Sequence, residues 1–206
     1  MDIVYINLDK RPDRRVQMER EFERLGLKAR RFAAVEAQPG GVGCALSHAA
    51  VLKQAIDDGS TELLVIEDDL EFWDGGAALA QRLGSFRAEY PTYDVLMLDY
   101  ALQAGTELGD WGGRVHAAST TGAYLVARHY MPTLHQCFME SALLFQANPT
   151  VHWLFSCDQY WKRLQQKDSW YYLTPRACSQ RSGYSDICEC HVEHTYAERP
   201  KHLPTL

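Results

Sequence analysis

The chain lacks several features that mark well-defined protein classes. No apolar run is long enough to cross a membrane, and residues 1–8 contain an early acid and are too short for a secretory signal. The formal charge is −6 and no basic block occurs, which argues against a nucleic-acid surface. Neither a Gly-Lys-Ser/Thr phosphate loop nor a Gly-x-Ser-x-Gly nucleophile turn is found. We therefore expect no integral membrane segment, no nucleic-acid partner and no covalent acyl chemistry.

Cysteine is present without the dense, even spacing of a disulfide scaffold. The six cysteines are Cys44, Cys137, Cys157, Cys178, Cys188 and Cys190. Without a secretory signal we expect reduced thiols in a cytoplasmic protein, with peripheral attachment at the inner membrane through a partner as the alternative. The 206 residues are 46% hydrophobic and can bury a core of their own. We expect one domain over 1–206, with an irregular tail from about residue 182.

Short apolar runs alternate with helical segments along most of the chain. We expect strands over 3–8, 31–35, 63–69, 94–98, 122–127 and 170–173. We expect helices over 12–25, 44–57, 77–89, 130–140 and 158–167, and a loop over 105–113. This alternation predicts an α/β fold, a three-layer α/β/α sandwich with a mostly parallel central sheet.

The most informative segment is an apolar run, 63–66, that ends in Glu67, Asp68 and Asp69. A wholly apolar run predicts a strand buried on both faces, and ligands bind at the carboxyl ends of such strands. Alternation along the strand predicts Glu67 and Asp69 on one side and Asp68 on the other. Adjacent anions repel each other unless a cation relieves them, and carboxylates suit Mg²⁺ or Mn²⁺. An acidic loop that solvates its charges is the alternative.

Two other segments are candidates for anion binding. Residues 40–43 form a glycine-rich stretch that runs into a helix containing Ser47 and His48, and a helix N-terminus attracts anions. Glycines needed for a tight loop are an equally good interpretation, and a lone histidine such as His48 is more often structural than catalytic. Arg14 follows the first strand, at the expected rim of the acids, and is the best phosphate ligand there. We interpret Arg11 and Arg15 as solvated.

The tail contains four metal-capable side chains within seven residues: Cys188, Cys190, His191 and His194. Zinc sites normally draw ligand pairs from separated segments, with two or more residues between the cysteines. We therefore favour a single histidine, His191 or His194, that completes the carboxylate metal site.

Several short motifs occur in a fixed order along nearly the whole chain. They are 4–8 followed by Arg-x-Asp-Arg-Arg at 11–15, Gly-Cys-Ala-Leu-Ser-His at 43–48, Glu-Asp-Asp at 67–69, Gly-Ala-Tyr-Leu-Val at 122–126, Asp158, and the stretch 180–187. In this order they resemble glycosyltransferase family 25, which includes lipopolysaccharide-biosynthesis transferases and collagen galactosyltransferases. The chain departs from the family pattern after Val126, where the acceptor side of the site is expected.

The resemblance implies a GT-A fold, a UDP-sugar donor carrying galactose or glucose, and a Mn²⁺ or Mg²⁺ cofactor. It also implies hexose transfer, with inversion, to a hydroxyl of a glycan, lipid-linked or protein acceptor. Asp69 is then the metal ligand, and the donor-binding residues are Asn7, Arg14, Ser47, His48, Glu67, Asp68 and Gln180.

Asp158 is the expected general base, because it follows an aromatic segment and matches a late acidic position of the family. A helix cap is the equally weighted interpretation of Asp158, and Asp99 and Asp186 are the next candidates for the base. Two other functions stay open. One is a catalytically silent nucleotide-sugar-binding partner, and the other is a glycoside hydrolase that uses paired carboxylates without metal.

Overall fold

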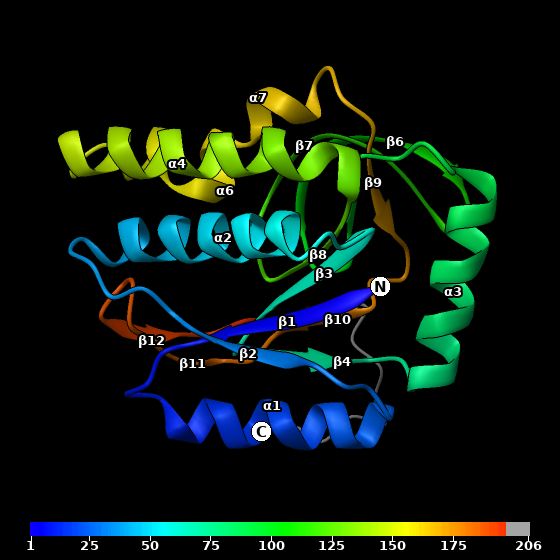
Figure 1. The fold of residues 1–206 in the computed structure, drawn as a ribbon, viewed down its shortest axis with the longest axis horizontal. Helices are drawn as coiled ribbons and strands as arrows, with labels where there is room; N and C mark the ends of the chain where they lie inside the picture. The colour runs from blue at the N-terminus through cyan, green and yellow to red at the C-terminus, as the bar shows by residue number, and fades with distance from the viewer. Residues whose placement is uncertain (197–206) are drawn as a thin grey trace.

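The computed structural model describes residues 1–196, which form a central sheet covered by helices on both faces (Figure 1). The eight strands of this sheet lie in the order β2, β1, β3, β8, β5, β9, β7, β6. In that order they span Arg30–Ala33, Asp2–Asn7, Glu62–Glu67, Ala123–Ala127, Val95–Met97, Trp170–Leu173, Gly112–Ser119 and Ala101–Gly109. Within this sheet, β7 and β8 run opposite to the other six strands. The predicted sandwich with a mostly parallel sheet is confirmed.

Four long helices form the outer layers. Helices α2 (Gly40–Asp57) and α4 (Met131–Ala147) cover one face, and α1 (Pro12–Leu25) and α3 (Gly76–Glu89) cover the other (Figure 1). Three short helices, α5 (His152–Phe155), α6 (Cys157–Tyr160) and α7 (Lys162–Gln165), continue from α4, which itself follows the 3-10 turn η1 (Arg128–Tyr130).

Strand β3 shows why this sequence forms a central strand. Leu63 and Val65 pack in the core below α2 and α4, whereas Leu64 and Ile66 pack in the core beside α1 and α3. All four side chains are 0% exposed. Burial of each such side chain stabilises the fold by about 1.5–3 kcal/mol, so the strand is fixed firmly from both sides. Its next residues, the acids, therefore emerge at a defined edge of the sheet.

The glycine-rich stretch is not a loop, because α2 begins at Gly40, four residues earlier than predicted. A Cβ atom on Gly41 would lie 2.4 Å from a ring carbon of Phe145, and one on Gly43 would lie 2.4 Å from the carbonyl oxygen of Val35. The glycines thus let the first turn of α2 pack closely against α4 and the segment after β2. The predicted tight loop is therefore wrong, and close packing of a helix explains the glycines instead.

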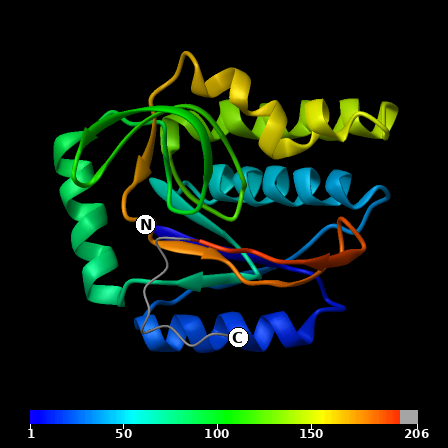
Figure 2. The ribbon, with the colours of Figure 1, turned by 180° about the vertical axis from the view of Figure 1, so that it is seen from behind.

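The predicted loop over 105–113 is also wrong, because β6 and β7 form a long antiparallel hairpin there. Every residue of β6 is exposed, so the strand carries no alternating apolar pattern that sequence reasoning could detect. Figure 2 shows this hairpin curling away from the central strands at the edge of the sheet.

The tail after residue 182 is not wholly irregular. Strands β11 (Gly183–Ser185) and β12 (Cys190–Val192) pair in a short antiparallel hairpin, and β10 (Cys178–Gln180) pairs with β4 (Leu70–Phe72) just before it. Figures 1 and 2 both place the hairpin beside the carboxyl end of β1 and the start of α1. Among the described residues, no helix is both long and apolar enough to span a membrane.

Candidate active site

The acidic segment lies at the carboxyl end of β3, as predicted. Glu67 is the last residue of the strand, Asp68 and Asp69 form a turn, and β4 begins at Leu70. Asn7, the last residue of β1, is at the same edge because β1 and β3 are parallel neighbours. The edge therefore brings polar side chains from two strands together.

Asp68 and Asp69 share a cation from α1. Arg14 Nη1 donates to Asp68 Oδ1 at 2.8 Å and to Asp69 Oδ2 at 3.1 Å, and Asn7 Nδ2 donates to Asp68 Oδ2 at 2.7 Å. The predicted position of Arg14 at the rim of the acids is confirmed. The predicted grouping of Asp69 with Glu67 is wrong, because the strand ends at Glu67 and its alternation does not continue through the turn.

The carboxyl group of Asp69 is held in an unusual electrostatic state. Its pKa is raised to about 7, chiefly by burial and then by the charges of Glu67 and Asp68, and Arg14 offsets only part of this rise. Its Oδ1 atom is buried and accepts no hydrogen bond from the described residues. Because a buried carboxylate oxygen normally has a partner, this atom is suited to accept a cation.

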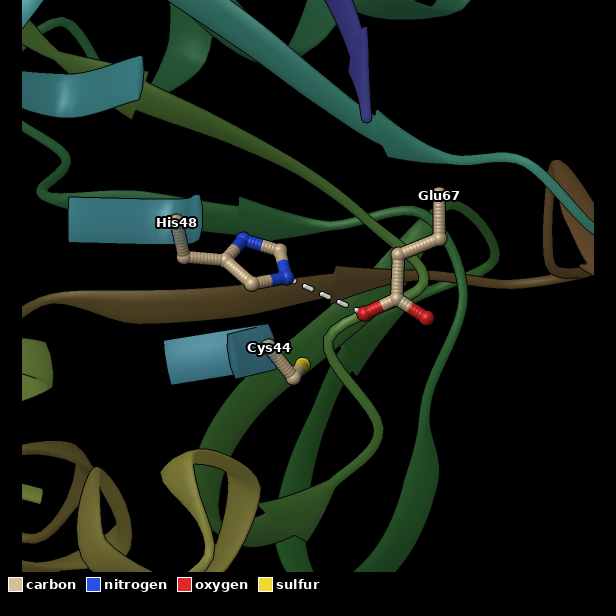
Figure 3. Close-up of side chains that lie close together, drawn as sticks. All are labelled: Cys44, His48 and Glu67. Atoms are coloured by element: carbon tan, nitrogen blue, oxygen red, sulfur yellow. Dashed lines mark hydrogen bonds and ion pairs between the residues drawn. The ribbon is translucent and has the colours of Figure 1, made fainter. Parts of the chain in front are cut away.

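Glu67 lies in a different setting, on the α2 side of the sheet (Figure 3). Its Oε1 atom is 3.1 Å from His48 Nε2 and accepts a 2.6 Å hydrogen bond from Thr121 Oγ1. His48 is 1% exposed, and its Nδ1 atom lies 3.0 Å from the Tyr124 hydroxyl. Burial acts to raise the pKa of Glu67, but the hydrogen bonds and charge of its neighbours outweigh burial and lower it.

Asp158 lies in the first turn of α6 but does not cap it, because the N-cap position belongs to Ser156. Its Oδ2 atom accepts hydrogen bonds at 3.2 Å from the backbone N–H of Thr120 and from Gln159 Nε2. Thr120 has a φ of 80°, so Asp158 stabilises a backbone conformation that β-branched residues rarely adopt. Burial raises the pKa of Asp158, the Thr120 N–H lowers it, and the charge of Glu67 raises it again.

Two further predicted donor residues lie in the framework around the site. Ser47 Oγ donates to Gly43 O at 2.7 Å and accepts from Val35 N at 2.8 Å, and the side chain is 1% exposed. Gln180 ends β10, where it pairs with Leu70 directly after the acids. Ser47 therefore fixes the segment after β2, and Gln180 fixes the chain that follows Asp69.

The tail histidines are not assembled into a metal site. His191 is exposed and its Nδ1 atom lies 3.2 Å from Glu193 Oε1, whereas the ring of His194 stacks on Tyr196. In the described part of the chain, the group of three or more possible metal ligands is Cys44, His48 and Glu67. Neither tail histidine joins the carboxylates in such a group.

Sequence reasoning missed residues that bond to the predicted ones from distant segments. Arg31 Nε donates to Asn7 Oδ1 at 2.9 Å, and Thr121 and Tyr124 contact Glu67 and His48. Thr121 lies directly before β8, and β8 pairs with β3 beside the acidic edge. Its position next to a predicted strand is the sequence signal that could have identified it. Asp99 was named only as a reserve base, yet it is buried and its pKa is raised to about 8, chiefly by burial.

A surface cavity of about 640 Å³ lies away from these acids. It is lined by residues at the opposite end of β3 and at the end of β8, including Glu62, Arg87, Tyr93 and Arg128. In an α/β sheet, ligands bind at the carboxyl ends of the parallel strands, so the acidic edge is the better candidate for the active site.

The comparisons with known proteins agree with the motifs. No family model matches the chain. It is 30% identical over 98 residues to a "Glycosyltransferase 25 family member" of Drosophila melanogaster, and 32% identical over 98 residues to one of Aedes aegypti. The resemblance to glycosyltransferase family 25 is confirmed. Each match covers 34% of this chain and 16% of the relative, so the chain spans only a small part of these longer proteins.

Solved structures show a looser likeness. One is the "glycosyltransferase involved in the glycosylation of the major capsid of PBCV-1", with 10% identity, a TM-score of 0.49, and coverage of 91% of this chain and 95% of that chain. Another is "A197 from STIV", with 10% identity, a TM-score of 0.48, and coverage of 98% and 99%. At these TM-scores the likeness does not extend to function.

Proposed function

We propose that this protein is a metal-dependent glycosyltransferase that moves a hexose, galactose or glucose, from a UDP-sugar to an acceptor hydroxyl with inversion. The observation that carries the proposal is the buried Asp69 Oδ1 atom, which has no hydrogen-bond partner and lies among Glu67, Asp68 and Arg14. Sequence similarity to members of glycosyltransferase family 25 supports the reaction class. The acceptor is a glycan, a lipid-linked sugar or a protein.

The residues at the acidic edge fit a hard divalent cation. Asp69 offers an unshared oxygen atom, and carboxylate oxygens are the ligands that Mn²⁺ and Mg²⁺ prefer. Asp69 would hold the cation, and His191 or His194 would have to leave its present contact with Glu193 or Tyr196 to add a further ligand. When bound, the cation supplies positive charge that stabilises the departing UDP.

Asn7, Arg14 and Asp68 would bind the donor beside this position. Arg14 keeps positive charge next to Asp69, which favours the diphosphate of the donor, and Asn7 orients the carboxylate of Asp68. We assign Asp68 to the ribose hydroxyls. Ser47, His48, Glu67 and Gln180 complete the donor side by fixing the segments that surround it.

Asp158 would act as the general base. Its carboxylate takes the proton of the acceptor hydroxyl while the acceptor oxygen bonds to the anomeric carbon. The bond from that carbon to the phosphate oxygen breaks, and its electron pair leaves with UDP. A raised pKa favours proton abstraction near neutral pH, and the bonds from Thr120 and Gln159 hold the carboxylate in place.

The experiment is a UDP-release assay with UDP-galactose and UDP-glucose, with Mn²⁺ and with EDTA. Water serves as the acceptor, so slow donor hydrolysis reports activity before the natural acceptor is known. We expect release with Mn²⁺ and none with EDTA. Binding without release would indicate the silent nucleotide-sugar-binding partner. Glycoside cleavage that persists in EDTA would indicate the glycoside hydrolase, and either result would contradict the proposal.

A further inference from the structure

We propose that Cys44, His48 and Glu67 form a second metal site, specific for zinc, in which Cys157 supplies the fourth ligand. The ligand class differs from that at Asp69, since thiol and imidazole groups select softer metals than carboxylates alone do. The site goes beyond the proposed sugar transfer and does not depend on it.

Two segments far apart in the sequence bring three ligand atoms together. Cys44 and His48 are four residues apart on α2, so they share one face of the helix, and Glu67 ends β3 below that face. One ligand atom from each of the three residues lies within 4.8 Å of the others. Figure 3 shows the sulfur, the imidazole and the carboxylate turned toward a common space.

The distance between two sulfur atoms matches a tetrahedral zinc centre. Zn–S bonds of about 2.3 Å and Zn–N or Zn–O bonds of about 2.0–2.2 Å place neighbouring ligand atoms roughly 3.4–3.8 Å apart at tetrahedral angles. The Cys44 and Cys157 Sγ atoms are 3.7 Å apart, within this range, whereas His48 Nε2 and Glu67 Oε1, at 3.1 Å, are at hydrogen-bond distance and would separate slightly around a metal ion. Cys157, the first residue of α6, lies beside Cys44 but outside the group of three, so its side chain would have to turn toward the metal to become the fourth ligand.

The neighbouring hydrogen bonds are those that zinc ligands normally have. Metal-bound histidine usually hydrogen-bonds through its second ring nitrogen, and here His48 Nδ1 lies 3.0 Å from the Tyr124 hydroxyl. Metal-bound carboxylates are hydrogen-bonded in turn, and Thr121 Oγ1 donates to Glu67 Oε1 at 2.6 Å. Both supporting residues come from 121–124, at the start of β8.

The protons and charges can be accounted for. When zinc binds, the S–H bonds of Cys44 and Cys157 break and both protons leave to solvent, so two thiolates and Glu67 bring three negative charges to the dication and the site carries a net charge of −1. His48 contributes its Nε2 lone pair in place of its bond to Glu67. The metal would join α2, β3 and α6, and α6 carries Asp158.

The test uses the full chain, reduced and stripped of metal, titrated with Zn²⁺ and with Co²⁺. We expect one equivalent of zinc and a higher melting temperature in its presence. Cobalt should give the near-ultraviolet charge-transfer band of a thiolate-bound metal, which Asp69 and other carboxylates cannot produce. A metal-titrated protein without that band would overturn the proposal.

Variants assign the ligands. Cys44→Ser should weaken zinc binding by at least roughly 100-fold, and Cys44→Ser and Cys157→Ser should each halve the band, because each variant leaves one thiolate ligand. Tyr124→Phe, which keeps the ring, should weaken binding roughly 10-fold. The matched control is Cys188→Ser with Cys190→Ser, which removes two exposed cysteines outside the group and should leave the band unchanged.

The outcomes separate this site from its alternatives. An unchanged band in Cys44→Ser would show that the metal binds elsewhere. Loss of the band in the Cys188→Ser, Cys190→Ser control would show that the metal binds to the tail. Either result would overturn the proposal. Melting curves of the metal-free variants exclude misfolding as the cause of lost binding. Because every readout is metal binding, a failed UDP-release assay would leave this result intact, and the reverse also holds.

Discussion

Neighbouring acids of one short motif lie in opposite chemical environments. Asp68 and Asp69 face α1, where a guanidinium and an amide hold them and one oxygen of Asp69 has no partner. Glu67 faces α2, among an imidazole, a hydroxyl and a thiol. The end of the strand produces this separation, because Glu67 is the last residue of β3 whereas Asp68 and Asp69 lie in the turn that follows, where strand alternation no longer applies. The three consecutive acids therefore belong to two separate sites and do not form a single set of ligands.

The largest effect is expected on the Asp69 side. Asp69→Asn should remove measurable UDP release, because an amide cannot supply the anionic oxygen that holds a divalent cation. Asp110→Asn, an exposed substitution of the same kind in the turn between β6 and β7, is the control and should keep normal release. Release by Asp69→Asn at the control rate would place the cation elsewhere.

The next largest effect is expected at Asp158. Asp158→Asn should lower the transfer rate by roughly 10²-fold while the KM for the donor stays near normal, because a general base acts in the chemical step alone. Asn can still accept the Thr120 hydrogen bond, so the fold should persist. Near-normal turnover would show that Asp158 is not the general base and would leave Asp99 and Asp186 as the candidates. Unfolding of the variant would show that Asp158 is a structural residue.

Asp99 sharpens the comparison, because it lacks the partners that its neighbours have. Both its carboxylate oxygens accept no hydrogen bond from the described residues, and Arg176 lies 3.6 Å away. Burial raises its pKa from 3.8 to about 8. A raised pKa stabilises the fold at low pH, and that stability is lost as the pH rises through about 8.

Stability of the metal-free protein should therefore fall between pH 4 and 8 by as much as about 1.4 kcal/mol per pH unit through Asp99. Asp99→Asn should flatten this dependence, and Asp110→Asn should not. Chemical denaturation in EDTA across this pH range measures it. An unchanged slope in Asp99→Asn would show that another group is responsible.

The smallest effect is expected at Ser47, on the α2 side. Ser47→Ala removes one donor and one acceptor and leaves the Val35 N–H without its partner, so the free energy of unfolding should fall by about 1–3 kcal/mol. Ser85→Ala, an exposed change within α3, should be close to neutral. Equal denaturation midpoints for the two variants would contradict the structural role of Ser47.

The fold was predictable where local signals and burial agree. Helix α1 has the predicted bounds because Pro12 begins it and Gly26, at a φ of 65°, ends it. The start of α2 was not predictable. Phe145 and Val35 leave no room for a side chain at Gly41 and Gly43, and they approach these glycines only in the folded chain. The β6–β7 hairpin was missed because its exposed outer strand has no apolar pattern.

The site was predictable to the level of its edge. Strand order along the chain placed Arg14 and the acids at one rim, and the structure confirms their proximity. The partners of Glu67 and His48 were not predictable, because Thr121 and Tyr124 reach them through the antiparallel insertion of β8 beside β3. Pairing of distant segments is a property of topology, which local sequence patterns do not encode.

The central claim is that Asp69 holds a cation that the donor needs. Isothermal titration calorimetry of UDP, with and without Mn²⁺, tests it directly in the unmodified protein and in Asp69→Asn. We expect Mn²⁺ to strengthen UDP binding at least roughly 10-fold, about 1.4 kcal/mol, in the unmodified protein and not in the variant. An equal gain from Mn²⁺ in both proteins would contradict the account.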